Sequence, residues 1–171
     1  MWSDDVDNLN GDASMVVAKP ANKALVSAAL QMLSRRDYCR SEFIDKLTSK
    51  EFEKRDVEDA ADWCHAQGFL NEARFAEGAS RRLGAKFGSQ RVAHTLRQKG
   101  VADEQISAVI LTLKESEHDR ARTLWNRKFG SVAESAEQKS KQIRYLQSRG
   151  FSFSVIKQVI IGVSDGANDG S

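Results

Sequence analysis

Three residues in the first half of the chain have the types and spacing of a helical metal site. Glu58, Asp62 and His65 are spaced i, i+4, i+7, which would place two carboxylates and an imidazole on one face of a helix. A di-iron centre would need a matching set from a second helix, and this spacing does not recur around His94 or His118. We therefore interpret the three residues as a solvated acidic face and predict no metal site.

Sequence motifs of nucleotide and metal chemistry are absent. The chain has no GxxxxGK[ST] phosphate loop, no GxGxxG dinucleotide turn and no HExxH metalloprotease motif. The two cysteines, Cys39 and Cys64, form no CxxC pair, so the sequence predicts neither a zinc site nor a disulfide framework. We therefore expect a protein that is not an enzyme, needs no cofactor and acts by binding other macromolecules.

Basic side chains gather in two stretches and are the best candidates for a binding site. The net charge of +2 combines −3 over residues 1–22, −2 over residues 162–171 and +7 over the residues between them. A basic body with acidic ends favours a polyanionic partner, because a guanidinium fork can bind a phosphate or a carboxylate, although a merely solvated surface would show the same pattern. The candidate binding residues are Arg81, Arg82, Lys86, Arg91, Arg97, Lys99, Lys139, Lys141, Arg144, Arg149 and Lys157.

The composition favours a folded, helical and soluble protein. Hydrophobic residues make up 40% of the 171 residues and charged residues 29%, which supplies a core without the charge excess of a disordered chain. Proline occurs once, at Pro20, and good helix formers dominate. No apolar run approaches the roughly 18 to 20 residues that cross a bilayer, and the aspartate-rich start does not resemble a signal peptide. We expect a cytoplasmic protein with no membrane partner.

A repeat of about 50 residues organises the chain. Leu47, Leu96 and Leu146 are separated by 49 and 50 residues. Within each repeat the apolar positions recur at the i, i+3, i+4, i+7 spacing of amphipathic helices. The same two offsets align five further sets: Ile44, Ala93 and Ile143; Lys50, Lys99 and Arg149; Phe52, Val101 and Phe151; Val57, Ile106 and Ile156; Ala61, Ile110 and Ile160.

Glycines mark the predicted ends of two of the repeated helices. Gly100 and Gly150 follow a basic residue and precede an apolar one, which is typical of a helix that ends in a left-handed residue. Glu51 occupies the same position in the first repeat, so we expect its turn to differ. Aromatic residues fall mostly on or beside the apolar stripes, and we assign them to the core: Phe43, Trp63, Phe69, Phe75, Phe87, Trp125, Phe129, Tyr145, Phe151 and Phe153.

The repeat predicts an all-α fold of three tandem three-helix repeats that form an elongated, curved body. Helices of about 10 to 13 residues are too short to be stable alone, so they must pack within a unit or against the next one. The third unit carries extra residues, 132–138, before its second helix. The predicted divisions are a flexible acidic segment at 1–22, unit 1 at 23–70, unit 2 at 71–116, unit 3 at 117–161 and a flexible tail at 162–171.

Four stretches of the chain follow one another in the order and spacing of a known protein family. They are LSRRDYCRSEFIDKL at 33–47, GFLNEARFA at 68–76, GSQRVAHTLRQKGV at 88–101 and IRYLQSRGF at 143–151. In order and spacing they resemble the RecX family, bacterial regulators of the RecA recombinase, and the resemblance covers about residues 23–161. It implies three three-helix repeats that bind the RecA filament on single-stranded DNA. It further implies inhibition of recombinase, ATPase and coprotease activity, and hence regulation of DNA repair and the SOS response. Contact with single-stranded DNA would be direct or through RecA, and we expect a monomer.

Two positions depart from the pattern of that family. Cys39 stands where the family often has serine, which weakens a capping box with Glu42. Asn71 and Glu72 stand where the family commonly has two aspartates; asparagine still caps a helix well, so the helix that follows should form.

The alternative function is that of a sequence-directed helix-turn-helix DNA-binding protein. Such a protein needs a recognition helix rich in Arg, Asn and Gln, and it is usually a dimer. The stretch from Asp103 to Leu113, the third helix of unit 2, is largely apolar and offers little to read base edges. That composition counts against the alternative.

Overall fold

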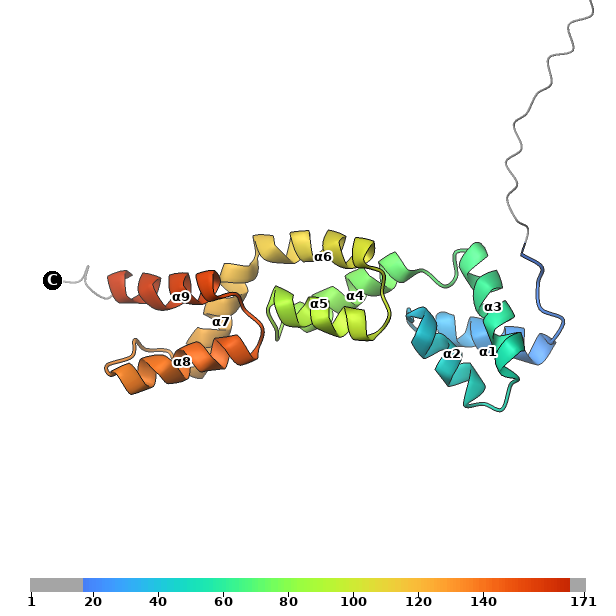
Figure 1. Cartoon of the computed structure of the whole chain (residues 1–171), viewed down its shortest axis with the longest axis horizontal. Helices are drawn as coiled ribbons and strands as arrows, with labels where there is room; N and C mark the ends of the chain where they lie inside the picture. Colours follow the sequence, from blue (N-terminus) through green and yellow to red (C-terminus); the bar gives the residue numbers. More distant parts are fainter. Residues whose placement is uncertain (1–16, 167–171) are drawn as a thin grey trace, which may run out of the picture.

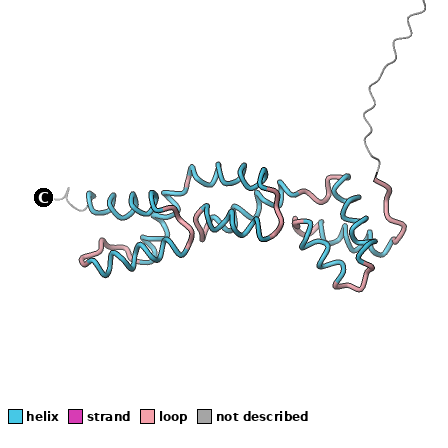
Figure 2. Tube along the Cα trace, viewed as in Figure 1, coloured by secondary structure: helices cyan, strands magenta, loops and turns pink. Residues whose placement is uncertain are grey.

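The computed structural model describes the backbone of residues 17–166 and the side chains of residues 17–161. Within that range every regular element is an α-helix, and the helices form three groups that follow one another along the long axis (Figures 1 and 2). Unit 1 contains α1 (Lys23–Leu33), α2 (Arg40–Thr48) and α3 (Lys54–Ala66); unit 2 contains α4 (Glu72–Gly84), α5 (Ser89–Gln98) and α6 (Asp103–Glu115); unit 3 contains α7 (Glu117–Lys128), α8 (Ala136–Ser148) and α9 (Phe153–Gly166).

Each unit has a hydrophobic core of its own. Leu47, Leu96 and Leu146, the residues that revealed the repeat, are fully buried in their respective units. Each leucine lies on the second helix of its unit, in a core to which all three helices of that unit contribute. This arrangement confirms the all-α fold of three three-helix repeats in an elongated row.

Four of the described helices begin with a side-chain cap. The side-chain oxygens of Asn22, Asn71, Ser135 and Ser152 accept hydrogen bonds from the backbone N–H of the third residue after each of them. The prediction that Asn71 caps its helix is therefore confirmed. Cys39 makes no such bond at the start of α2, and Glu42 is instead paired with Arg36 at 2.6 Å.

The turn after the second helix has the same left-handed geometry in all three units. Gly100 and Gly150 have φ of 76° and 79°, as predicted, and Glu51 has φ of 66°. The expectation of a different turn in unit 1 is therefore wrong in backbone conformation. An L-residue in this region costs about 1 to 2 kcal/mol, so packing in unit 1 must hold Glu51 in a conformation that glycine adopts freely.

Most of the predicted core aromatics are buried or half-buried, with two exceptions. The exposed fractions of Phe69 and Phe153 are 43% and 65%, so their assignment to the core is wrong. Phe69 lies in the turn after α3, where its ring meets Trp63 at 5.9 Å. Phe153 is the first residue of α9 and lies on the side of that helix that faces α8, at the rim of a groove.

The third unit differs from the others in its connections. The extra residues predicted before its second helix are divided between the loop that ends at Ser135 and the first turn of α8. Helix α9 continues to Gly166, beyond the predicted end of unit 3 at residue 161. The rest of the predicted tail and residues 1–16 of the acidic segment lie outside the described part of the chain. No helix within the described range is long and apolar enough to span a membrane.

Candidate functional site

Units 2 and 3 meet through their backbones, at what we call the second junction. The turn between α8 and α9 reaches the start of α5, where the Gly88 N–H donates to the Arg149 carbonyl at 2.9 Å. The Gln90 N–H donates to the Gly150 carbonyl at 3.3 Å. Two N–H groups at the start of α5, which have no partner inside their own helix, are thus satisfied by the next unit.

This approach depends on two glycines. A Cβ atom on Gly88 would overlap the backbone of Gly150 and Phe151. A Cβ atom on Gly150 would overlap Arg91, whose backbone N would lie only 2.7 Å away. Neither backbone can yield as a flexible side chain could, so both positions require glycine.

A buried carboxylate of unit 3 makes a further contact with unit 2 at the second junction. Glu117, the first residue of α7, has an exposed fraction of 4%, and its Oε1 accepts hydrogen bonds from both the N–H and the hydroxyl of Ser89, each at 2.8 Å. The contact places a negative charge at the N-terminus of α5, which the helix dipole favours. Unit 3 therefore caps a helix of unit 2.

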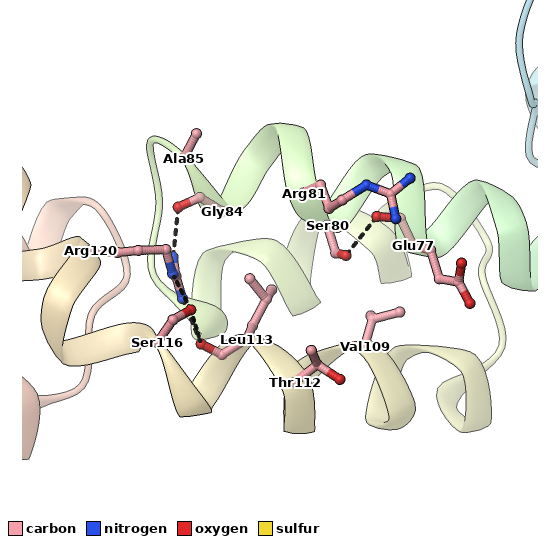
Figure 3. Close-up of a pocket in the computed structure, with 10 residues that line it drawn as sticks. All are labelled: Glu77, Ser80, Arg81, Gly84, Ala85, Val109, Thr112, Leu113, Ser116 and Arg120. Atoms are coloured by element: carbon pink, nitrogen blue, oxygen red, sulfur yellow. Dashed lines mark hydrogen bonds between the residues drawn. The ribbon is translucent and has the colours of Figure 1, made fainter.

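Arg120, one turn further along α7, ties three chain segments together. Its guanidinium donates to the carbonyls of Gly84, Phe87 and Leu113 at 2.6, 2.9 and 2.9 Å, which Figure 3 shows in part. The Gly84 and Leu113 carbonyls lie in the last turns of α4 and α6, where no further helical N–H is available, and the Phe87 carbonyl lies in the turn before α5. Burial lowers the pKa of Arg120 below its usual value, and the charge of Glu117 opposes that shift.

Units 1 and 2 meet mainly through side chains, at the first junction. The Ser41 hydroxyl donates to the Lys99 carbonyl at 2.9 Å, and Arg74 of α4 pairs with Asp37 of unit 1 at 2.5 Å. Cys39, which the repeat aligns with Gly88, is 1% exposed and packs into the core of unit 2. The Cys39 side chain keeps the backbones of units 1 and 2 apart, whereas the backbones of units 2 and 3 touch at the equivalent position, Gly88.

The structure distributes the predicted binding residues over several places rather than one patch. Arg81 and Arg82 lie in the last turn of α4 and Lys86 follows it, all three exposed. Arg81 lines an open groove of about 570 Å³ between α4 and α6, whose far end is closed by Arg120 (Figure 3).

The two α5 arginines of the predicted site already have partners within the described body, Arg91 at the second junction and Arg97 inside unit 2. Arg91 donates to the Ser148 carbonyl of unit 3 at 2.8 Å and lies over the Phe87 ring at 4.3 Å. Arg97 pairs with Asp103 at 3.0 Å. These two guanidinium groups therefore hold the body together as well as lining its surface.

The remaining predicted residues belong to unit 3. The Arg149 guanidinium lies over the Tyr145 ring at 4.2 Å, beside the second junction. Lys141 and Arg144 are exposed on α8. Lys139 and Lys157 flank a groove of about 260 Å³ between α8 and α9, which is otherwise lined by apolar side chains.

The metal-like spacing in α3 has an ordinary structural explanation. Asp62 pairs with Arg40 at 2.7 Å, Glu58 lies 3.9 Å from Lys54, and His65 is exposed in the last turn. Among the described residues no group of three His, Cys, Asp or Glu side chains could hold a metal ion. Cys39 and Cys64 are both free thiols, and burial raises the pKa of Cys64 to about 11.

Sequence reasoning missed the two residues that fix the second junction, Glu117 and Arg120. They lie in the first turn of a strongly charged helix, where acidic and basic residues usually face water. No sequence pattern indicated them, because the contact of Ser89 with Glu117 arises only when the units are stacked.

Comparison with known proteins finds a matching family model for each of the three units. Family models of the first, second and third three-helix domains of RecX match residues 26–64, 71–110 and 115–160. The chain is 35% identical over 137 residues to the regulatory protein RecX of Leptothrix cholodnii, covering 80% of this chain and 87% of that protein. It is 36% identical over 134 residues to that of Herminiimonas arsenicoxydans, covering 78% and 89%.

Solved structures agree with this assignment at the level of the fold. The crystal structure of RecX from Lactobacillus salivarius superposes with a TM-score of 0.71 at 20% identity, over 82% of this chain and 95% of that one. Another RecX crystal structure gives a TM-score of 0.70 at 22% identity, over 83% and 72%. The chain thus belongs to the RecX family of regulatory proteins.

Proposed function

We propose that this chain binds the RecA filament on single-stranded DNA in the cytoplasm and inhibits its recombinase, ATPase and coprotease activities. In this way it would regulate DNA repair and the SOS response. The observation that carries the proposal is a rigid pair of units, 2 and 3, that presents basic side chains along one elongated body. A row of similar units suits a target that is itself a helical array of identical subunits.

The basic residues differ in how far they are available to a partner. Arg91 and Arg97 already have partners within the body, so they position their helices first. No described carboxylate lies within ion-pair distance of the nine others, which are the preferred contacts with RecA carboxylates or DNA phosphates. These are Arg81, Arg82, Lys86, Lys99, Lys139, Lys141, Arg144, Arg149 and Lys157.

The activity is tested by RecA-driven ATP hydrolysis on single-stranded DNA with increasing amounts of the protein. We expect inhibition well below one regulator per RecA, because a body that spans several filament subunits blocks more than one of them. An unchanged hydrolysis rate at an equimolar ratio would contradict the proposal.

A second experiment separates contact with RecA from contact with DNA. We expect tighter binding to RecA-coated than to bare single-stranded DNA, with direct phosphate contacts adding a log–log salt slope of about −0.7 for each phosphate. Equal affinity for both, with sequence preference, would instead favour the helix-turn-helix alternative.

A matched pair of variants locates the contact. Lys141→Glu with Arg144→Glu changes the exposed face of α8, and Lys54→Glu with Arg55→Glu makes the same change of charge on the exposed start of α3. We expect the first pair to weaken filament binding about tenfold or more and the second to have little effect. Equal losses from both pairs would point to net charge rather than to a site on unit 3.

A further inference from the structure

The repeat leaves one of its own contact surfaces open at the end of the row. In unit 2 the start of α5 is covered by unit 3, through Glu117 at Ser89 and through the turn at Arg149. The 50-residue offset aligns Ser89 with Lys139. In unit 3 Lys139 lines the groove between α8 and α9, and no described segment covers this groove.

The composition of this groove defines what can bind there. Its floor is formed by Ile143, Ile156 and Ile160, and its rim carries Phe153 and Ile161, whose exposed fractions are 65% and 41%. Lys139 and Lys157 flank it, with no carboxylate among the described side chains within ion-pair distance. An apolar floor between two ammonium groups fits a short segment with an apolar stripe and flanking carboxylates.

The chain itself contains a segment of this kind. Residues 1–16 carry four aspartates and no lysine or arginine. Trp2, Val6 and Leu9 are spaced i, i+4, i+7, which aligns them on one face if the segment becomes helical on binding. In unit 2 a carboxylate at the start of a helix, that of Glu117, likewise binds the start of α5.

Geometry requires that the segment come from another copy. The described chain begins at Val17, which packs on the core of unit 1, at the opposite end of the row from α8 and α9 (Figure 1). Between them lie units 1 and 2, and α6 and α9 alone add about 40 Å at 1.5 Å per residue. If residues 2–9 are helical in the groove, the seven residues up to Val17 extend at most about 25 Å.

We propose that residues 1–16 of one copy bind the α8–α9 groove of a second copy, which links the copies head to tail. The contact is small, so it is weak in dilute solution and the free chain remains mainly monomeric. The fraction of grooves that are occupied rises where copies are held side by side, because the local concentration of the segment is then high. The inference does not depend on the identity of the proteins that the body binds.

The test uses a fluorescein-labelled synthetic peptide of residues 1–16 and the full-length chain, followed by fluorescence anisotropy. We expect saturable binding that weakens with salt and falls at least about tenfold in Ile161→Asp and in Lys157→Glu. Leu111→Asp is the matched control, because Leu111 holds the aligned position on α6 and is 68% exposed. It should leave the affinity unchanged.

Sedimentation of the full-length chain tests the contact between copies. The average mass should rise with concentration, and Trp2→Asp and Ile161→Asp should each abolish that rise. The proposal is overturned if the peptide does not bind, if Leu111→Asp weakens it as much as Ile161→Asp, or if the chain stays monomeric far above the peptide Kd. The last result would mean that the groove serves a different partner.

Discussion

The two junctions join equivalent parts of the repeat by different means. At the second, Gly88 lets the backbone of unit 2 bond directly to the backbone of unit 3, and Glu117 and Arg120 satisfy buried helix ends from across the boundary. At the first, Cys39 takes the place of Gly88, and the contacts are a serine hydroxyl and exposed charges. We therefore expect units 2 and 3 to behave as one block and unit 1 to unfold more independently.

The largest effect should come from closing the glycine space at the second junction. Gly150→Ala adds a methyl group that overlaps Arg91, together with the strain of a left-handed alanine, and should cost about 3 kcal/mol or more. Gly100→Ala has the same strain, but its methyl group would meet nothing closer than the Ser41 hydroxyl at 3.9 Å, so about 1 kcal/mol is expected.

Urea unfolding measures both variants. Trp125 lies in the core of unit 3 and Trp63 in that of unit 1, so a chain in which the other tryptophans are replaced by Phe reports on one unit at a time. Gly150→Ala should shift mainly the Trp125 transition. Equal losses in the two alanine variants would show that the close approach of the backbones contributes nothing.

The next effect concerns the two arginines that cross the junctions. Arg120→Met leaves three buried carbonyls without their donor and should cost about 2 to 3 kcal/mol. Arg74→Met removes an exposed pair with Asp37 and a bond to the Phe69 carbonyl, and should cost about 1 kcal/mol or less. The same unfolding experiment compares them, and a larger loss in Arg74→Met would reverse the ranking of the junctions.

A stabilising substitution in unit 1 also tests whether the units unfold separately. Glu51→Gly restores to unit 1 the glycine present in units 2 and 3, and should add about 1 kcal/mol by removing left-handed strain, less the entropy that glycine loses on folding. If unit 1 unfolds by itself, only the Trp63 transition should move to higher urea. A matching shift in the Trp125 transition would show that all three units unfold together.

The repeat made most of the fold predictable, because each element had two aligned copies. The same apolar stripe in all three units predicted the helices. The glycines after Lys99 and Arg149 predicted where the second helices of units 2 and 3 end. Glu51 was misjudged because the turn is dictated by packing within the unit as well as by residue type. Phe153 was misjudged because helical spacing predicts the side of a helix on which a residue lies, but not how much of its side chain the neighbouring helix covers.

The site was less predictable than the fold. Sequence identifies which residues are basic, but it does not show that the Arg91 guanidinium is used by the Ser148 carbonyl, 57 positions away. Glu117 and Arg120 had the charge of surface residues, and they are buried and half-buried, respectively, only because α7 starts against unit 2. Contacts between units depend on how the units stack, which no pattern within one unit contains.

The smallest predicted effect distinguishes the junctions by their response to acid and salt. A hydrogen bond from Arg36 lowers the pKa of Glu42, burial opposes the shift, and the charges of Arg36 and of Lys99 from unit 2 lower it further. Because the folded-state pKa lies below the unfolded value of about 4.3, this carboxylate adds stability above that pH and loses it as the pH falls through the folded value.

Glu42→Gln should therefore lower the stability of unit 1 by less than about 1 kcal/mol at pH 7, and the difference from the unchanged chain should shrink as the pH falls below the unfolded value of Glu42 and through its lower folded-state value. One molar salt should also shrink that difference, since Glu42 and its partners are partly exposed. The loss in Gly150→Ala should persist under both conditions, because steric overlap carries no charge. The contrary outcome is that acid or salt reduces the losses of stability in Glu42→Gln and Gly150→Ala alike. The first junction would then not be the more electrostatic of the two, and the contrast between a charged and a backbone-bonded junction would have to be abandoned.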